Sequence, residues 1–131
     1  MDQIRNRDKI RPFITKDGSE IIEIFHPNNS SIKSMSFAEA TVYTKESSKY
    51  HIHTKADEIY FIFDGRGTME IGGKKATVGK GDCIFIPAKT KHRIKNIGKV
   101  PLRILCSSSP PYSHKDTTLV GKKGLKKILR P

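Results

Sequence analysis

Two histidines and a glutamate stand close together in the segment YHIHTKADEIYFIFDGRG, residues 50–67. Successive side chains of a strand point to opposite faces, so His51 and His53 share a face if residues 49–54 form a strand. Glu58 begins the next apolar run after a short turn. In an antiparallel pair of strands it lies opposite the two histidines. Two imidazoles and one carboxylate on one concave face make a partial coordination sphere for a divalent transition metal.

His92 offers a fourth ligand, in the segment KHRIKN, residues 91–96. This segment follows GDCIFIP, residues 81–87, after a short turn, and we expect the two to form a second hairpin. Periodicity alone does not establish that this hairpin faces the first. Taken singly, each of the four residues is explained as well by a hydrogen-bonded place in the core or on the surface. The metal hypothesis therefore depends on the complete set.

The elements that must position these residues are short strands. Runs of β-forming residues recur between turn residues. They are FITK (13–16), EIIEIF (20–25), FAEATVYTK (37–45), KYHIHT (49–54), EIYFIF (58–63), TMEI (68–71), KKATV (74–78), CIFIP (83–87), KHRIKN (91–96) and LRILC (102–106). Many short strands at close spacing indicate an antiparallel sandwich or barrel, which buries the inward face of each strand and limits bare sheet edges. Only GLKKIL, residues 124–129, has helical spacing.

The composition indicates one cytoplasmic domain. The chain has 131 residues, of which 35% are hydrophobic and 29% charged. No apolar run approaches the roughly 20 residues that span a bilayer, and the first residues lack the apolar part of a signal peptide. Cys83 and Cys106 stand in apolar runs, so we expect two buried free thiols. Neither belongs to a Cys-x-x-Cys pair, which argues against a thiolate zinc site.

The net charge of +12 comes from 25 basic and 13 acidic residues. The last residues, LVGKKGLKKILRP, carry five basic side chains and no acidic one. Such a tail could attract nucleic acid, an anionic lipid or an acidic partner. Charge alone says little about a specific partner, so a solvated tail is the preferred interpretation.

The order and spacing of the candidate ligands resemble the cupin superfamily. The first cupin motif, His-x-His, four residues, Glu, six residues and Gly, is matched by His51, His53, Glu58 and Gly65. The second motif, Gly, five residues, Pro, four residues, His, three residues and Asn, is matched by Gly81, Pro87, His92 and Asn96. The resemblance covers residues 35–107 and is to small single-domain cupins of the mannose-6-phosphate-isomerase-like type. Lys89 and Lys45 stand where cupins often have glycine, which puts the local turn geometry in question.

The resemblance implies an all-β fold, a double-stranded β-helix or jelly-roll barrel of two antiparallel sheets with a short C-terminal extension. It implies that His51, His53, Glu58 and His92 together bind one divalent transition metal, for which iron, manganese, nickel and zinc all suit the ligand set. Residues 1–34 form N-terminal strands and a candidate dimer contact, residues 35–107 the barrel core, and residues 108–131 a proline-rich segment and basic tail. A homodimer is expected.

Alternation along the strands suggests which residues line the pocket around the metal. Tyr60 and Ile62 share the face of Glu58, and Ile94 shares the face of His92. Glu39 would point inward in one register of its strand and outward in the other. Plain core packing accounts equally well for Ile62 and Ile94.

The segment PPYSH, residues 110–114, contains two further candidates. Its two prolines stiffen the chain and could lay Tyr112 and His114 over the mouth of the barrel. A tail packed on the outside or against a partner subunit is the preferred interpretation.

These expectations favour a metal-dependent enzyme that acts on a small oxygen-rich molecule, of the sugar or sugar-phosphate isomerase type or the dioxygenase type. A non-catalytic metal-dependent protein that binds a small molecule is the alternative. No catalytic base is placed by the sequence. Fold-level resemblance does not choose among these reactions.

Overall fold

The computed structural model describes residues 3–121 of the chain. Within this range it contains one 3-10 turn, η1 (Arg7–Lys9), and eleven strands. The strands are β1 (Phe13–Ile14), β2 (Glu20–Phe25), β3 (Ser36–Val42), β4 (His51–His53), β5 (Asp57–Asp64), β6 (Arg66–Ile71), β7 (Lys74–Gly79), β8 (Cys83–Ile86), β9 (His92–Asn96), β10 (Leu102–Ser109) and β11 (Thr117–Leu119). The predicted helical segment at 124–129 and most of the basic tail lie outside the described residues.

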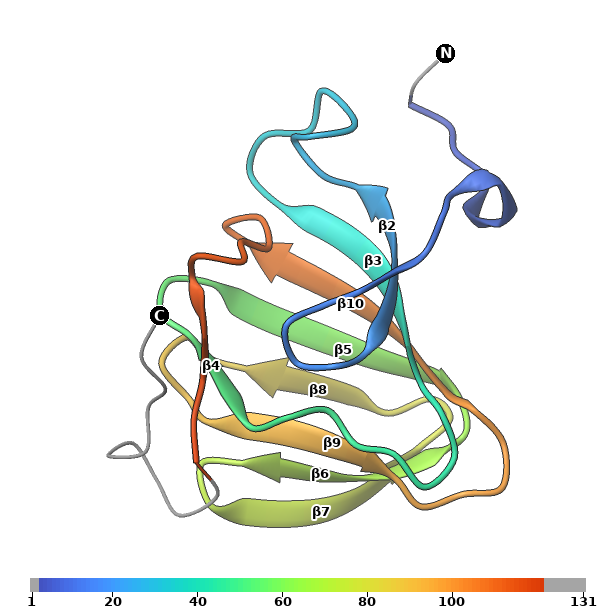
Figure 1. Cartoon of the computed structure of the whole chain (residues 1–131), viewed down its shortest axis with the longest axis vertical. Helices are drawn as coiled ribbons and strands as arrows, with labels where there is room; N and C mark the ends of the chain where they lie inside the picture. Colours follow the sequence, from blue (N-terminus) through green and yellow to red (C-terminus); the bar gives the residue numbers. More distant parts are fainter. Residues whose placement is uncertain (1–2, 122–131) are drawn as a thin grey trace.

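The strands form two antiparallel sheets, which confirms the predicted all-β jelly-roll class. One sheet has the order β1-β2-β3-β10-β5-β8 and the other the order β11-β4-β9-β6-β7 (Figure 1). From β4 to β11 the chain crosses between the sheets at almost every connection, and only β6 and β7 are consecutive neighbours in one sheet. Among residues 3–121, no helix has the length and apolar character needed to cross a membrane.

The prediction that the segments carrying the candidate ligands form two hairpins is wrong. β4 pairs with β11 and β9, whereas β5 pairs with β10 and β8, so these consecutive strands lie in different sheets. In the same way, β8 pairs with β5 and β9 pairs with β6. The short connection at 54–56 carries the chain from one sheet to the other, and the Asp116 carboxylate accepts hydrogen bonds from the backbone N–H groups of Lys55 (2.9 Å) and Ala56 (3.2 Å). The ligands therefore face one another across the two sheets.

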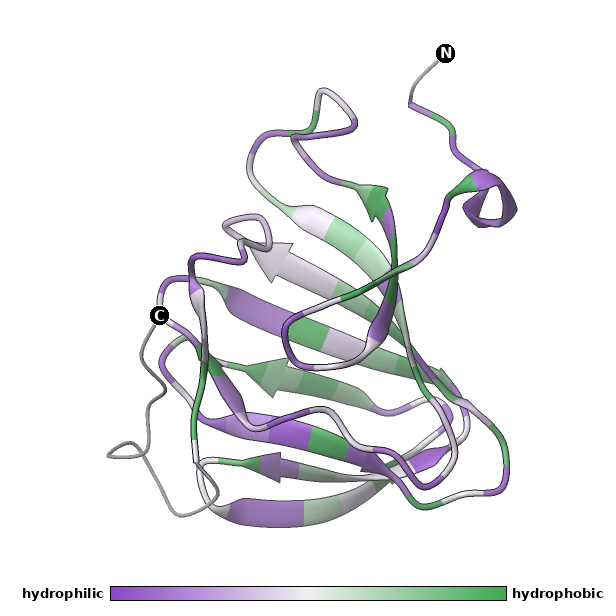
Figure 2. Ribbon diagram, in the orientation of Figure 1, coloured by the Kyte–Doolittle hydropathy of each residue, from purple (hydrophilic) through white to green (hydrophobic). Residues whose placement is uncertain are grey.

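The space between the sheets holds the apolar core. Ile62, Ile86, Leu102 and Ile104 are almost completely buried there. β5 shows the underlying pattern, because its exposed and buried residues alternate over Asp57–Ile62. Figure 2 shows bands of polar and apolar residues alternating along several strands. Alternation of this kind gives each strand one inward apolar face, which is why so short a chain can form two layers.

The two cysteines are free, as predicted, but Cys83 is exposed rather than buried. It lies on β8, an edge strand of the six-stranded sheet, where Ile84 and Ile86 face the core. Alternation then directs Cys83 and Phe85 to the outside. An apolar run therefore indicates a strand but does not show that both of its faces are covered.

The two lysines at expected glycine positions keep the glycine-like conformation. Lys45 and Lys89 have φ angles of 68° and 67°, in the left-handed region that side chains other than glycine seldom adopt. The Lys89 N–H donates to the carbonyl of His53 at 2.7 Å, which connects the turn before β9 to strand β4. The local turn geometry is thus retained with strain in place of a glycine.

Candidate metal centre

All four predicted ligands come together between the two sheets. His51 and His53 lie on β4, His92 on β9 and Glu58 on β5. One ligand atom from each lies within 4.8 Å of the others, and all four residues are buried. His51 and His92 are direct register partners in the five-stranded sheet, and Glu58 faces them from the six-stranded sheet. This cluster could hold a metal ion.

Backbone carbonyls fix the orientation of two imidazole rings. His51 Nδ1 lies 2.7 Å from the carbonyl oxygen of Lys49, and His92 Nδ1 lies 2.9 Å from that of Thr90. A carbonyl only accepts, so each Nδ1 carries the hydrogen and each Nε2 presents a lone pair. Such an outer contact holds a metal-binding imidazole in the required tautomer.

Thr117 does the same for His53. The Thr117 hydroxyl donates to the carbonyl of Ser113 at 2.9 Å and lies 3.0 Å from His53 Nδ1, so it accepts from that nitrogen. β11 pairs with β4 in a register that sets Thr117 opposite His53. Strand β11 was not predicted, because TTLV is short and follows two prolines. Thr117 was missed for the same reason.

The unmet hydrogen-bonding capacity at the centre fits a cation. Glu58 Oε1 lies 3.0 Å from His53 Nε2 and 3.4 Å from His92 Nε2. Neither Glu58 Oε1 nor His92 Nε2 makes a hydrogen bond of good geometry to any residue in the range 3–121, although both atoms are buried. Leaving buried polar atoms unpaired is unfavourable. A bound divalent ion would satisfy both atoms at once.

The protonation states at the centre also suit metal ligands. Burial acts to raise the pKa of Glu58, but the facing His53 and His92 outweigh it and hold this pKa well below its usual range. Burial, together with the charge of His92, lowers the pKa of His51 to about 4. Burial acts to lower the pKa of His53, but Glu58 outweighs it and the net shift is upward. At neutral pH Glu58 is therefore a carboxylate and His51 a neutral imidazole.

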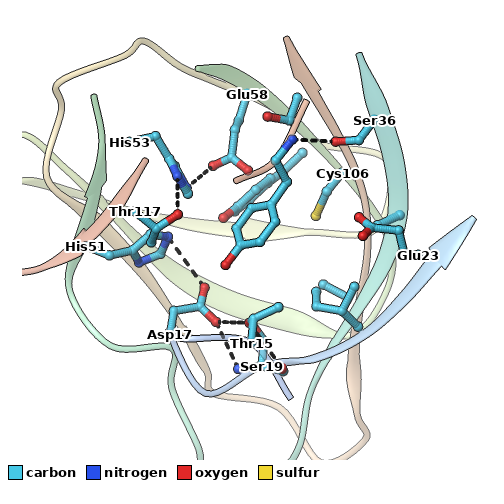
Figure 3. Close-up of a pocket in the computed structure, with 16 residues that line it drawn as sticks. Thr15, Asp17, Ser19, Glu23, Ser36, His51, His53, Glu58, Cys106 and Thr117 are labelled. Atoms are coloured by element: carbon cyan, nitrogen blue, oxygen red, sulfur yellow. Dashed lines mark hydrogen bonds and ion pairs between the residues drawn. The ribbon is translucent and has the colours of Figure 1, made fainter. Parts of the chain in front are cut away.

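Asp17 brings a further carboxylate to the centre that the sequence did not suggest. It lies in the turn between β1 and β2, and its Oδ2 is 3.4 Å from His51 Nε2 (Figure 3). Its Oδ1 accepts from the hydroxyl of Thr15 at 2.7 Å, the backbone N–H of Ser19 at 2.9 Å and the Ser19 hydroxyl. Burial acts to raise the pKa of Asp17, but His51 and these donors lower it overall.

The sequence predicted the turn that carries Asp17, but it did not predict that this turn lies beside the histidine cluster. The letters DGS indicated a turn, and Gly18 has the positive φ of 93° that favours glycine there. A turn signal says where the chain reverses, whereas the contact of Asp17 with His51 joins residues far apart in the sequence. No pattern in the sequence reports that contact.

The pocket next to the four ligands is lined by some, but not all, of the residues predicted for it. Tyr60 and Tyr112 line it, together with hydroxyl-bearing residues. Asp17, Glu23 and Cys106 also line it (Figure 3). Burial raises the pKa of Cys106 well above its usual range, so this group is a neutral thiol. Ile62 and Ile94 are absent from the lining and belong to the apolar core.

Glu39 lies outside the pocket. Ala38 and Ala40 occupy the inward positions of β3, so Glu39 points to the other face of the sheet. There its carboxylate accepts from Arg7 Nε at 2.9 Å, Arg7 Nη2 at 2.6 Å and Arg103 Nη2 at 2.9 Å. The register with Glu39 inward was therefore wrong, and its burial comes from the N-terminal segment that covers it.

The structure separates the two candidates in the PPYSH segment. Tyr112 lines the pocket, with its ring centroid 6.0 Å from that of His53, contrary to the preferred interpretation of a tail packed outside. Its backbone is anchored at both ends, because its N–H donates to Ser36 Oγ at 2.9 Å and its carbonyl lies 2.8 Å from His26 Nε2. His114 is exposed and lines a separate outer hollow.

Comparisons with known proteins agree with this architecture. A family model described as a cupin domain matches residues 38–108. An uncharacterised protein of Methanocaldococcus jannaschii is 52% identical over 113 residues, which cover 86% of this chain and 90% of that protein. The solved structure of a predicted oxalate decarboxylase from Thermotoga maritima superimposes with a TM-score of 0.72 over 82% of this chain and 98% of that one, at 25% sequence identity.

A more distant solved structure shares the fold alone. The nucleoside dehydratase Pac13 of Streptomyces superimposes with a TM-score of 0.71 over 89% of each chain, at 13% sequence identity. The proteins similar to this chain therefore differ in the activities that their descriptions give.

Proposed function

The chain belongs to the cupin family, and from this premise we propose that it is a metal-dependent enzyme acting on a small, oxygen-rich molecule. One observation carries the proposal. Three imidazole rings are each held through Nδ1, and one ligand atom from each of them and from Glu58 lies within 4.8 Å of the others in a buried cluster. Burying three imidazoles and a carboxylate costs free energy, and packing of an apolar core does not require their common orientation.

His51, His53, His92 and Glu58 would hold the ion, and the set of three nitrogens and one oxygen suits iron, manganese, nickel or zinc. When bound, such an ion supplies Lewis-acid polarisation of a substrate oxygen, or oxygen chemistry if it is iron. The residues of the chain provide the rest of the site. Thr117 and two backbone carbonyls orient the rings, and the sheets keep the cluster away from bulk water.

The pocket walls suit a substrate with several oxygen atoms. Burial raises the pKa of Tyr60 well above its usual range, so its phenol stays protonated at neutral pH. The phenol can therefore donate a hydrogen bond to a substrate oxygen. Tyr112 closes another side of the pocket, where its ring lies near His53. Isomerase and dioxygenase chemistry are both compatible with these groups.

Metal analysis tests the proposal. The wild-type chain, purified without oxygen and offered each of the four metals in turn, is expected to retain about one ion per chain. His92→Ala should weaken retention by more than about 100-fold, since it removes a ligand rather than an outer contact. His114→Ala is the matched control, because His114 is exposed and lies outside the pocket.

A wild-type chain that retains no stoichiometric ion under any metal supply would overturn the proposal. A chain that binds the ion and small molecules but turns over none of a panel of sugars, sugar phosphates, catechols and diketones would instead favour a non-catalytic binding protein.

A homodimer is part of the proposal. The outer face of the six-stranded sheet exposes Ile59 on β5 beside its register partner Phe85 on β8. Exposed apolar side chains that lie together suit an interface. Sedimentation of the full chain should show a mass twice that of the monomer, and a monomer at all concentrations would remove this part.

A further inference from the structure

The charge of the pocket opposes the charge of the chain. The chain carries a net charge of +12. Within residues 3–121, no lysine or arginine lines the pocket beside the metal cluster, whereas three carboxylates do. These are Asp17, Glu23 and Glu58. This basic protein therefore places no lysine or arginine, among residues 3–121, where the pocket would need one to bind a phosphate or carboxylate group.

Asp17 and Glu23 approach the pocket from different elements. Asp17 is held by Thr15 and Ser19 in the β1–β2 turn and points its second oxygen toward His51. Glu23 lies on β2, and Figure 3 shows it across the pocket from the histidines. Burial raises the pKa of Glu23 despite the opposing effect of His26. An ionised Glu23 repels an anion, and a protonated Glu23 supplies one neutral O–H donor but no positive charge.

Two lysines, Lys16 and Lys115, are close to lining residues of the pocket in the sequence or in the outer hollow but do not belong to its lining. Lys16 precedes Asp17, but its ammonium group donates to the carbonyls of His114 (3.0 Å) and Thr117 (2.7 Å). Lys115 lines the separate outer hollow, which shares Glu23 and Tyr112 with the pocket. Neither lysine lines the pocket itself.

Apart from the candidate ligands His51 and His53 and the Cys106 thiol, the other polar side chains of the pocket carry neutral hydroxyls. Thr15, Ser19, Ser36, Ser108 and Thr117 line it together with two tyrosines. The hydroxyls of Thr15, Ser19, Ser108 and Thr117 already donate within the protein and keep acceptor lone pairs, which suit the hydroxyl groups of an uncharged polyol, sugar or nucleoside. Ile21, Ala38 and Ala40 supply apolar wall between them.

We propose that the pocket selects uncharged, hydroxyl-bearing molecules and excludes phosphorylated and carboxylated ones, with Asp17 and Glu23 setting this preference. The inference rests on the proposed metal function and narrows its substrate class. The two positive charges of a divalent ion are already matched by Glu58 and Asp17. An anionic ligand therefore enters a site with no remaining positive charge and meets Glu23 as well.

The test measures ligand binding to cobalt(II)-loaded protein by its visible spectrum, so it does not depend on turnover. The probes are oxalate, a dianion, and imidazole, a neutral ligand. Asp17→Asn and Glu23→Gln should each raise oxalate affinity at least tenfold and change imidazole affinity less than threefold. Glu46→Gln is the matched control, because it removes one carboxylate from an exposed position outside the pocket and should change neither affinity.

Oxalate that binds the wild type as tightly as it binds both variants would overturn the inference while leaving the metal function intact. Equal gains in all three variants would also overturn it, since net charge rather than the pocket would then be responsible. A wild-type chain that takes up neither cobalt nor any of the four metals named above would overturn the metal function itself. Two variants from separate elements guard against one of them misfolding, and thermal unfolding identifies that case.

Discussion

At the scale of single residues, the candidate metal cluster depends on side chains that would not contact a bound ion themselves. Thr117 is the clearest case, because its hydroxyl accepts from His53 Nδ1 while it donates to the carbonyl of Ser113. Thr117→Val keeps the shape of the side chain and removes the acceptor. We expect the affinity for zinc or manganese to fall about 10- to 100-fold, the usual effect of losing an outer contact of a metal ligand.

Competition with a chelator of known affinity measures this change. Thr118→Val is the matched control, because it makes the same substitution at the next position of β11, which does not line the pocket. Equal affinities in wild type and Thr117→Val would show that strand β4 alone orients His53.

The residues that could be predicted are those whose spacing is local. His51, His53 and Glu58 fall within eight positions, and strand alternation suffices to place the two histidines on one face. Thr117 and Asp17 reach the same centre from opposite ends of the chain. Their sequence surroundings, a short strand and a common turn, do not distinguish them from surface residues.

At the scale of elements, the sequence predicted most strands but not how they pair. Alternation reports which residues of β5 face inward, yet it is the same whether β5 pairs with β4 or crosses to the other sheet. A short connection serves a hairpin and a crossover equally well. For this reason the prediction of the hairpins was wrong. The prediction that His51 and Glu58 lie close together was nevertheless confirmed, because two facing sheets also bring them together.

At the scale of elements, we predict how substitutions in the turn between β8 and β9 change the free energy of unfolding. Lys89 is held at φ 67°, and its N–H donates to the carbonyl of His53. Lys89→Gly removes the strain but gives the unfolded chain more freedom, so we expect a net stabilisation of no more than about 1 kcal/mol. Lys89→Val should destabilise by more than about 1 kcal/mol, since a β-branched side chain tolerates this conformation least.

Urea unfolding of the wild type, Lys89→Gly and Lys89→Val measures these differences. The free energy of unfolding should be highest for the Gly variant, intermediate for the wild type and lowest for the Val variant. Lys80→Val, at another exposed turn position but without a positive φ, controls for the effect of valine itself. A Val variant as stable as the Gly variant would mean that the backbone at this position relaxes out of the left-handed region.

At the scale of the whole molecule, one ion-pair network joins the N-terminal segment to the sheet that carries Glu58. Glu39 on β3 contacts Arg7 from η1 and Arg103 from β10, and its own side chain is 5% exposed. Burial acts to raise the pKa of Glu39, but the two guanidinium groups outweigh it and the net shift is downward. The folded chain therefore holds this carboxylate ionised at a lower pH than the unfolded chain does.

The sign of the pH dependence follows from that downward shift. The contribution of Glu39 to stability is fully present above its unfolded pKa of about 4.3 and is lost as the pH falls through the folded pKa. Glu39→Gln should lower the free energy of unfolding at pH 7 by about 1 kcal/mol, a modest value because both arginines are partly exposed. Below about pH 4 the difference from wild type should shrink.

Urea unfolding at pH 7 and at pH 3.5 measures both differences, with the exposed Glu46→Gln as control. A difference that is the same at both pH values would mean that the side chain contributes through packing rather than through its charge.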